Sequence, residues 1–266
     1  MIPKKRMKLV DTILSIGNTI YVIICVGIST LIGCSPLVAA LFFAHNWASW
    51  PLWVIAFWLS TPGLAAAFAV FRDAPVLQPH GDMNRYANYE KLPIWVAQPY
   101  VPLTKSAAVW RPYFSAYGHL FKRAIIASSI FIAVMALFTE DIQIMKNIPH
   151  GFIAVPFLIV SLVLLLQMTF NALMLIVEYP CSHYTSIWRN CLMLSVRKLW
   201  IPISSVIVLI GYGYGLAGKA LIVLPLATGF VLYIVFALTR WQSRILMDRL
   251  AKESNDHNVR RFYGVN

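Results

Sequence analysis

Long apolar runs constrain this chain more than any other feature of its sequence. A transmembrane helix needs about 20 mostly apolar residues to cross about 30 Å of hydrocarbon. Stretches without Asp, Glu, Lys or Arg predict six such helices, at residues 13–34, 51–71, 124–138, 152–177, 201–216 and 220–239. The third run is short. The last two are separated by little more than Gly218 and Lys219, so they can only form a tight helical hairpin.

The composition excludes an ordinary soluble domain. Of the 266 residues, 59% are hydrophobic and 12% are charged, whereas soluble domains are about 45–50% apolar and about 25% charged. So few charged residues cannot cover a soluble protein of this size unless much of its surface faces lipid. We therefore expect an all-α polytopic membrane protein that forms a single helical membrane domain over residues 1–266.

The placement of the basic residues predicts the orientation of these spans. The chain carries 22 Lys and Arg residues against 10 Asp and Glu residues, a net charge of +12. If both termini are cytoplasmic, 20 of the 22 basic residues are cytoplasmic too, and Lys146 and Lys219 lie outside. Because basic residues concentrate in cytoplasmic loops, this distribution favours six crossings, a cytoplasmic insert at residues 72–123 and a cytoplasmic tail at residues 240–266. Contact with the lipid bilayer then explains the net charge, and nucleic acid is not expected as a partner.

Two cytoplasmic stretches have the pattern of amphipathic interfacial helices. The insert begins with a proline-rich part at residues 73–109, after which aromatic residues recur at helical spacing through residues 110–123. The second stretch, residues 187–199, places Ile187, Trp188, Cys191, Leu192, Ser195 and Leu199 on one face. Such helices either anchor the neighbouring spans or form a docking surface. The residues expected to contact a partner or lipid are Trp110, Arg111, Tyr113, Phe114, Lys122, Arg123, Trp188, Arg189, Arg197 and Lys198.

Polar residues inside the expected spans are few. No Asp, Glu, Lys or Arg lies near the bilayer centre, which argues against proton-coupled transport or ion pumping. The remaining candidates are the amides Asn18, Gln167 and Asn171. Gln167 and Asn171 are four residues apart and therefore lie on one face of their helix. These amides either form hydrogen bonds between membrane helices or line a substrate path.

The glycine-rich end of the fifth span matches a dinucleotide-binding motif, but it lacks the strand and helix that such a motif joins. Gly213, Gly215 and Gly218 fit the pattern GxGxxG, but a dinucleotide site places these glycines between a strand and a helix. Here they lie between two apolar spans, where Gly211 and Gly215 predict close helix contact instead. The histidines, cysteines and acidic residues form no catalytic or metal-binding pattern. We expect no catalytic residue, no cofactor and no metal.

Residues 1–34 also resemble a cleaved lipoprotein signal, because a basic stretch and an apolar stretch end in LIGC at residues 31–34. The apolar run, however, exceeds the usual length of about 7–15 residues. Its apolar character also continues past Cys34 to Ala44. The alternative is that small residues permit a bend before Pro36. We expect this bend rather than lipidation of Cys34.

The pattern as a whole resembles the YesL-like family of bacterial integral membrane proteins. The resemblance rests on TPGLAAAF at residues 61–68 leading to Arg72, on YFSAYGHLFKRA at 113–124, and on EYP at 178–180 followed by TSIWRN at 185–190 and RKL at 197–199. It covers most of the chain, which departs from the family in the proline-rich insert. The family has no established biochemical activity, and its members are often encoded beside carbohydrate ABC-transporter components.

This resemblance implies a non-enzymatic accessory or regulatory component of a bacterial carbohydrate ABC-type uptake system in the plasma membrane. Permease or ATPase subunits would be its partners, and the two amphipathic stretches would form its contact face. The alternative is a stand-alone small-solute transporter or channel, with Asn18, Gln167 and Asn171 along its path.

Overall fold

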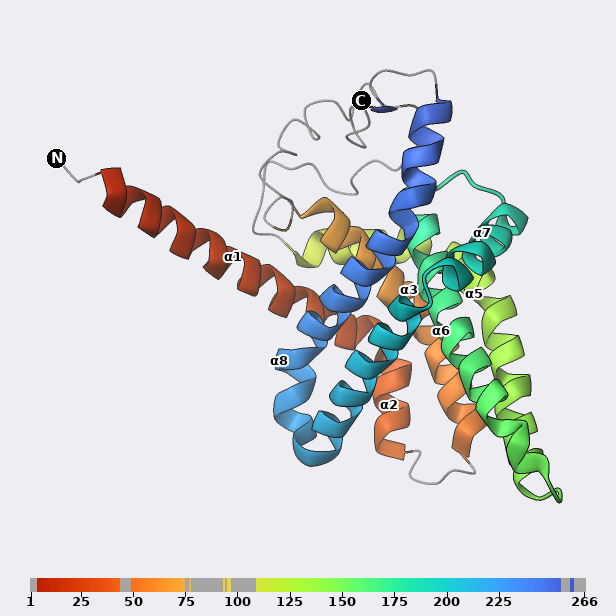
Figure 1. Ribbon diagram of the computed structural model, residues 1–266. Helices are drawn as coiled ribbons and strands as arrows, with labels where there is room; N and C mark the ends of the chain where they lie inside the picture. Colours follow the sequence, from red (N-terminus) through yellow and green to blue (C-terminus); the bar gives the residue numbers. More distant parts are fainter. Residues whose placement is uncertain are drawn as a thin grey trace.

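The computed structural model describes residues 4–43, 49–74, 77, 93, 95–96, 109–254 and 259–260. Over this part of the chain the structure is helical and contains no strand. The elements are α1 (Lys4–Gly33), α2 (Ser35–Phe43), α3 (Trp50–Asp73), α5 (Trp110–Lys146), the 3₁₀ helix η4 (Gly151–Ile153), α6 (Val155–Glu178), α7 (Tyr184–Arg197) and α8 (Trp200–Glu253). Figure 1 shows an upright bundle from which α1 projects sideways, while α7 lies near the upper end. The expected all-α class is confirmed.

Five described helices are long and apolar enough to cross a membrane: residues 14–33, 50–73, 110–146, 151–178 and 200–253. The number differs from the six expected spans because α8 contains both the fifth and the sixth. Its backbone leaves the helical region at Lys219, where φ is −147° and ψ is 59°. Figure 1 shows its two arms running in opposite directions from this turn, and the hydroxyls of Tyr212 and Thr228 join them at 2.6 Å. The expected tight hairpin is therefore present as the two arms of α8.

The third expected span and the amphipathic stretch before it form one continuous helix. α5 covers 37 residues, whereas the sequence predicted a span at residues 124–138 after a separate interfacial helix. That prediction ended the span before Glu140 and Asp141, because charged residues leave the hydrocarbon. The helix itself continues, since its backbone hydrogen bonds do not depend on apolar side chains. In Figure 1 its first part lies across the bundle and its second part descends along it. The bend expected before Pro36 is also present, because α1 ends at Gly33 and α2 begins at Ser35.

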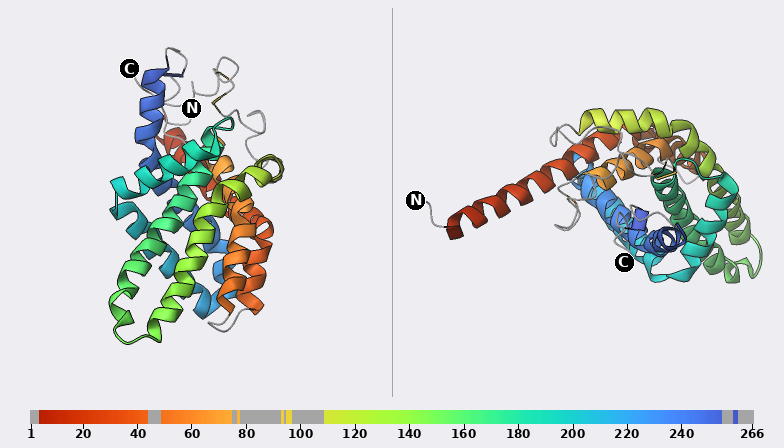
Figure 2. Two further views of the ribbon diagram at one scale, coloured as in Figure 1. Left: turned by 90° about the vertical axis from the view of Figure 1, so that its right-hand side faces the viewer. Right: turned by 90° about the horizontal axis from the view of Figure 1, so that it is seen from above.

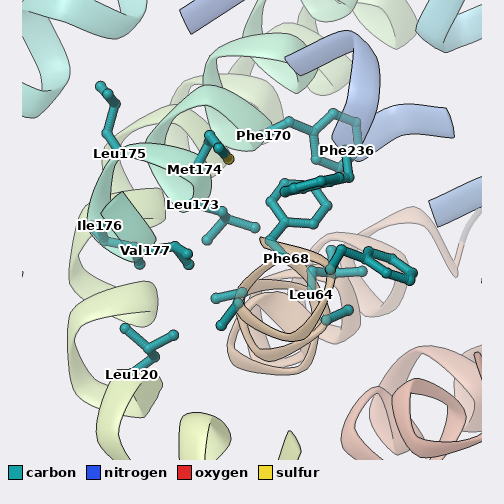
Figure 3. Close-up of a cluster of buried hydrophobic side chains, with 14 of the residues drawn as sticks. Leu64, Phe68, Leu120, Phe170, Leu173, Met174, Leu175, Ile176, Val177 and Phe236 are labelled. Carbon is teal, nitrogen blue, oxygen red and sulfur yellow. The ribbon is translucent and has the colours of Figure 1, made fainter. Parts of the chain in front are cut away.

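Helices α3 and α6 form the centre of the bundle. Residues 60–72 of α3 and residues 167–178 of α6 are buried without interruption, so neither stretch has an exposed face. Phe68 of α3 packs against Phe170 of α6 and Phe236 of α8, with ring centroids 6.4 and 5.5 Å apart. Figure 3 shows this aromatic contact beside aliphatic side chains of α6. The core thus joins three helices that are distant in sequence.

Glycines permit close helix contact at two crossings. A Cβ atom on Gly27 of α1 would lie 2.6 Å from the backbone nitrogen of Gly229 of α8, and one on Gly63 of α3 would lie 2.8 Å from a backbone atom of Gly33. Only glycine fits such approaches. The prediction of close contact through Gly211 and Gly215 was wrong. A Cβ on Gly211 would meet nothing within 4 Å, and one on Gly215 would meet the Val223 side chain at an ordinary 3.5 Å.

Candidate functional site

A buried network of uncharged polar side chains joins α6, α7 and α8. Gln167 Nε2 donates to Gln242 Oε1 at 2.9 Å and to Thr239 Oγ1 at 3.4 Å. Gln242 Nε2 in turn donates to the Leu194 carbonyl at 2.7 Å. The side chains of these glutamines and of Thr239 are almost completely buried. The network therefore connects the centre of the bundle to α7 through amides and hydroxyls, without a titratable group.

Asn171 forms a second part of this network. Its Nδ2 donates to Ser195 Oγ of α7 at 3.0 Å, and both residues are buried. The amide oxygens of Gln167 and Asn171 are also buried, and neither has a hydrogen-bond partner in the described part of the chain. The sequence correctly placed Gln167 and Asn171 on one face of a helix. They bind different neighbours, however: α8 for Gln167 and α7 for Asn171.

The third expected intramembrane amide does not join the network. Asn18 lies in the projecting half of α1, where residues 14–21 are largely exposed. The right view of Figure 2, seen from above, shows α1 extending away from the other helices. The structure therefore does not bring Asn18, Gln167 and Asn171 together along one path.

Sequence reasoning missed the α8 side of the network. Gln242 was assigned to the cytoplasmic tail because Arg240 precedes it, and Thr239 was the last residue of an expected span. The available signal was their spacing, since residues three apart share a helix face. Ser195 lay on a predicted amphipathic face, but nothing in the sequence indicated that it would bind Asn171.

Two arginines bind backbone carbonyls at the C-terminal end of α6 and in the connection that follows it. Arg72, at the end of α3, is 4% exposed and donates through Nη1 to the Val177 carbonyl in the last turn of α6. Its Nε and Nη2 bind the Asp73 carboxylate at 2.7 and 2.9 Å. A cation at the C-terminal end of a helix also interacts favourably with the helix dipole. Arg72 therefore joins the ends of α3 and α6.

Arg123 of α5 binds the connection between α6 and α7. Its Nη2 donates to the Ser182 carbonyl at 2.8 Å, and its guanidinium carbon lies 5.7 Å from the centroid of the Tyr184 ring. Arg123 was expected to contact a partner or lipid, but the structure uses it to fix the entry into α7. No sequence pattern indicated this role, because 59 residues separate Arg123 from Ser182.

The first part of α5 has three different faces. Tyr113, Ala116 and Leu120 are buried, and the Tyr113 hydroxyl donates to the Gly63 carbonyl at 3.0 Å. A second face exposes the aromatic rings of Trp110, Phe114 and Phe121, and a third exposes Arg111 and Lys122. Tyr113 was expected on the contact face, whereas it packs inside the bundle. The other members of that face in α5, Trp110, Arg111, Phe114 and Lys122, are exposed.

The buried and exposed faces of helix α7 also differ from those predicted. Ile187, Cys191, Leu194 and Ser195 form its buried face, whereas Leu192, Met193, Val196, Arg189 and Arg197 are exposed. The prediction placed Leu192 and Leu199 on one face with Ile187 and Cys191, whereas Leu192 and Leu199 are more than half exposed and the other two are buried. Trp188 is half-buried, and its indole nitrogen donates to the Ala127 carbonyl of α5 at 3.0 Å. Thus α7 packs on the bundle through one apolar face and presents a second apolar face outward.

Two cavities adjoin these elements. One of about 220 Å³ lies between α1, α2, α3, α6 and both arms of α8, and nearly all of its lining side chains are apolar. The other, of about 260 Å³, lies beside the α6–α7 connection, where Ser182, Ser186 and Asn190 face Leu246 and Leu250 of α8. The apolar cavity offers no hydrogen-bonding path for a polar solute.

The cysteines differ in accessibility. Cys181, in the α6–α7 connection, is exposed, and Cys191 is buried on the inner face of α7. Burial raises the pKa of the Cys191 thiol. The Cys34 thiol is buried and donates to the Ser60 carbonyl at 3.4 Å. Among the described residues, no group of three His, Cys, Asp or Glu side chains is arranged to hold a metal ion.

The fold and this network define an all-helical protein whose long helices are compatible with a membrane. No family model, no curated protein and no solved structure matches this chain. The resemblance to the YesL-like family therefore stays a prediction.

Proposed function

We propose that this protein is a non-enzymatic integral membrane protein of the plasma membrane, with six crossings and both termini in the cytoplasm. In this topology the two arms of α8 are separate spans. The arrangement in Figure 1 supports the proposal, because the α8 turn at Lys219 and the end of α5, where Lys146 lies, share the lower end of the bundle. Helix α7 and the C-terminal end of α8 lie toward the upper end. The two basic residues assigned to the outside thus belong to one end of the molecule.

Within this topology the protein acts as an accessory or regulatory component of another membrane complex. The observation that carries this proposal is the course of α1. Its second half packs against α8 at Gly27 and Gly229, but its first half leaves the bundle with apolar residues uncovered, Leu14 by 59% and Ile16 by 55%. Exposed apolar residues on a helix that projects from a bundle are available to pack against a neighbouring membrane protein.

The resemblance to the YesL-like family directs the search for that neighbour to a carbohydrate ABC-type importer, whose permease or ATPase subunits would be the partners. The exposed faces of α5 and α7 support a second contact region at the cytoplasmic membrane surface. Both combine exposed apolar residues with basic ones, Arg111 and Lys122 in α5 and Arg189 and Arg197 in α7. This is the composition of interfacial helices that also meet partners.

Photo-cross-linking in the native membrane tests this proposal. A photoreactive residue replaces Ile16 in the projecting half of α1, and the matched control replaces Leu221, which is 86% exposed and lies beside the turn of α8. The proposal expects permease or ATPase subunits in cross-links from position 16 and not from position 221. Repeated recovery of no importer subunit, by cross-linking and by affinity purification in mild detergent, would remove the proposal.

A stand-alone transporter is the second candidate. The observation that favours it is the pair of buried amide oxygens of Gln167 and Asn171 that lack a donor, since unpaired acceptors are available to a polar solute. Reconstitution of the purified protein in liposomes tests this alternative. Solute uptake that is lost in Gln167→Leu and Asn171→Leu, while the folded fraction is unchanged, would favour transport over the accessory role.

A further inference from the structure

Aromatic and basic side chains gather where α7 leads into α8. Lys198 Nζ lies 5.1 Å from the centroid of the Trp241 ring. The rings of Trp200 and Trp241, from the two arms of α8, meet edge-on with centroids 4.7 Å apart. Arg197 precedes Lys198, and Arg244 follows Trp241 by three residues, so it lies on the same helix face. We refer to Arg197, Lys198, Trp200, Trp241 and Arg244 as the junction cluster.

The cationic groups of the junction cluster are not neutralised within the described structure. Arg197 and Arg244 are exposed, and Lys198 is half-buried. None of the three forms an ion pair with a described residue. The ion pair found among the described residues joins Arg72 and Asp73 at the end of α3. The nearest acidic residue along α8 is Asp248, one turn beyond Arg244, and the two are not paired. The cluster therefore presents an excess of positive charge.

The aromatic and apolar surroundings place this charge at a membrane surface rather than in open solvent. Trp200 and Trp241 are 44% and 52% exposed, although they pack against each other. Exposed apolar residues flank them, namely Met193, Val196 and Leu199 before the cluster and Ile203 after it. Tryptophan concentrates at the level of lipid headgroups, with basic side chains extending past it toward the phosphates. Acyl chains would cover the apolar residues while a phosphate meets the cations.

We propose that the junction cluster binds the headgroup of an anionic phospholipid in the leaflet that α7 contacts. Charge complementarity favours an anionic over a zwitterionic headgroup, because three unpaired cations gain more from a net negative lipid. The exposed apolar residues beside the cluster favour a lipid over a free phosphate, which gains nothing from Val196 or Leu199. The cation–π contact with the Trp241 ring holds the Lys198 ammonium in place. The junction cluster is therefore a defined site rather than a diffuse positive charge.

Native mass spectrometry of the full-length protein in mild detergent tests this proposal. Phosphatidylglycerol and phosphatidylcholine with identical acyl chains are titrated against the wild type, the double variant Lys198→Gln/Arg244→Gln and the control Arg249→Gln/Lys252→Gln. The control removes the same charge from exposed positions of α8 beyond the cluster. At about fivefold for each cation, the double variant is expected to bind phosphatidylglycerol about 25-fold more weakly, and the control less than about twofold.

A conservative variant and two folding measurements distinguish loss of lipid binding from loss of the fold. The conservative variant Lys198→Arg is expected to keep phosphatidylglycerol binding within about twofold, because it retains the charge near Trp241. Circular dichroism and the unfolding midpoint identify any variant that loses its fold. Equal binding of the two lipids by the wild type, or equal losses in the double variant and the control, would overturn the proposal. The experiment uses the isolated protein, so its failure leaves the accessory role unaffected.

Discussion

The hydrogen bonds of Gln242 allow a quantitative test of the buried network. Its side chain accepts a hydrogen bond from Gln167 and donates one to the Leu194 carbonyl, whereas Gln167 shares one short hydrogen bond and one long one. Hydrogen bonds between membrane helices contribute about 0.6 kcal/mol on average and up to about 1.7 kcal/mol. At about 1 kcal/mol for each short bond, Gln167→Leu is expected to lower the free energy of unfolding by about 1 kcal/mol. Gln242→Leu is expected to lower it by about 2 kcal/mol.

The double variant separates a direct contact from two independent effects. The bond between Gln167 and Gln242 is lost only once, so the double variant is expected to lose about 2 kcal/mol rather than the 3 kcal/mol of the summed single changes, a coupling of about 1 kcal/mol. Reversible unfolding in mixed detergent micelles measures all three values. Asn18→Leu, at an exposed position of α1, is the matched control and should change stability by less than about 0.5 kcal/mol. Strictly additive losses, or a Gln167→Leu effect no larger than that of the control, would refute the reasoning.

Three other predictions concern helix packing, thiol chemistry and the buried ion pair. Gly229→Leu is expected to separate α1 from α8 and to lower the unfolding free energy by about 1–3 kcal/mol, whereas Gly211→Leu, which faces open space, should cost less than about 0.5 kcal/mol in the same measurement. Exposed Cys181 should react with a membrane-impermeant maleimide in inside-out vesicles. Cys191 should not react between about pH 7 and 9, because burial raises its pKa and leaves little thiolate. Equal labelling of the two cysteines, measured by peptide mass spectrometry, would contradict this prediction. Arg72→Ala removes the ion pair with Asp73 and the hydrogen bond to the Val177 carbonyl, and should cost about 3–5 kcal/mol. The expected result is loss of monodisperse protein in size-exclusion chromatography, and a normal elution profile with an unchanged unfolding midpoint would disprove it.

The sequence predicted the positions of the long apolar helices well, because the need to keep charges out of hydrocarbon is local and can be read from composition. It predicted their ends less well. α5 continues to Lys146 past Glu140 and Asp141, since helical hydrogen bonding tolerates charged residues that hydrocarbon excludes. The break before Pro36 and the hairpin at Lys219 were also predicted, because proline and short connections restrict the backbone locally.

The candidate site was predicted only in part. Spacing placed Gln167 and Asn171 on one face of α6, but no sequence pattern indicated that Gln242 would meet one of them and Ser195 the other. The same limit explains why Tyr113 was assigned to an exposed face. An amphipathic pattern shows that a helix has two environments, but it does not show which apolar residue meets protein and which meets lipid.

The sequence by itself determined that the chain is an all-helical protein with several apolar helices, and its charges determined a hypothesis for their orientation. Only the tertiary structure decided that Gly27 meets Gly229, that Arg72 joins the ends of α3 and α6, and that Lys198 lies against Trp241. The physical reason is that hydropathy and helical periodicity act along one helix. Contacts between helices depend instead on how several surfaces pack together, and residues far apart in the chain supply those surfaces.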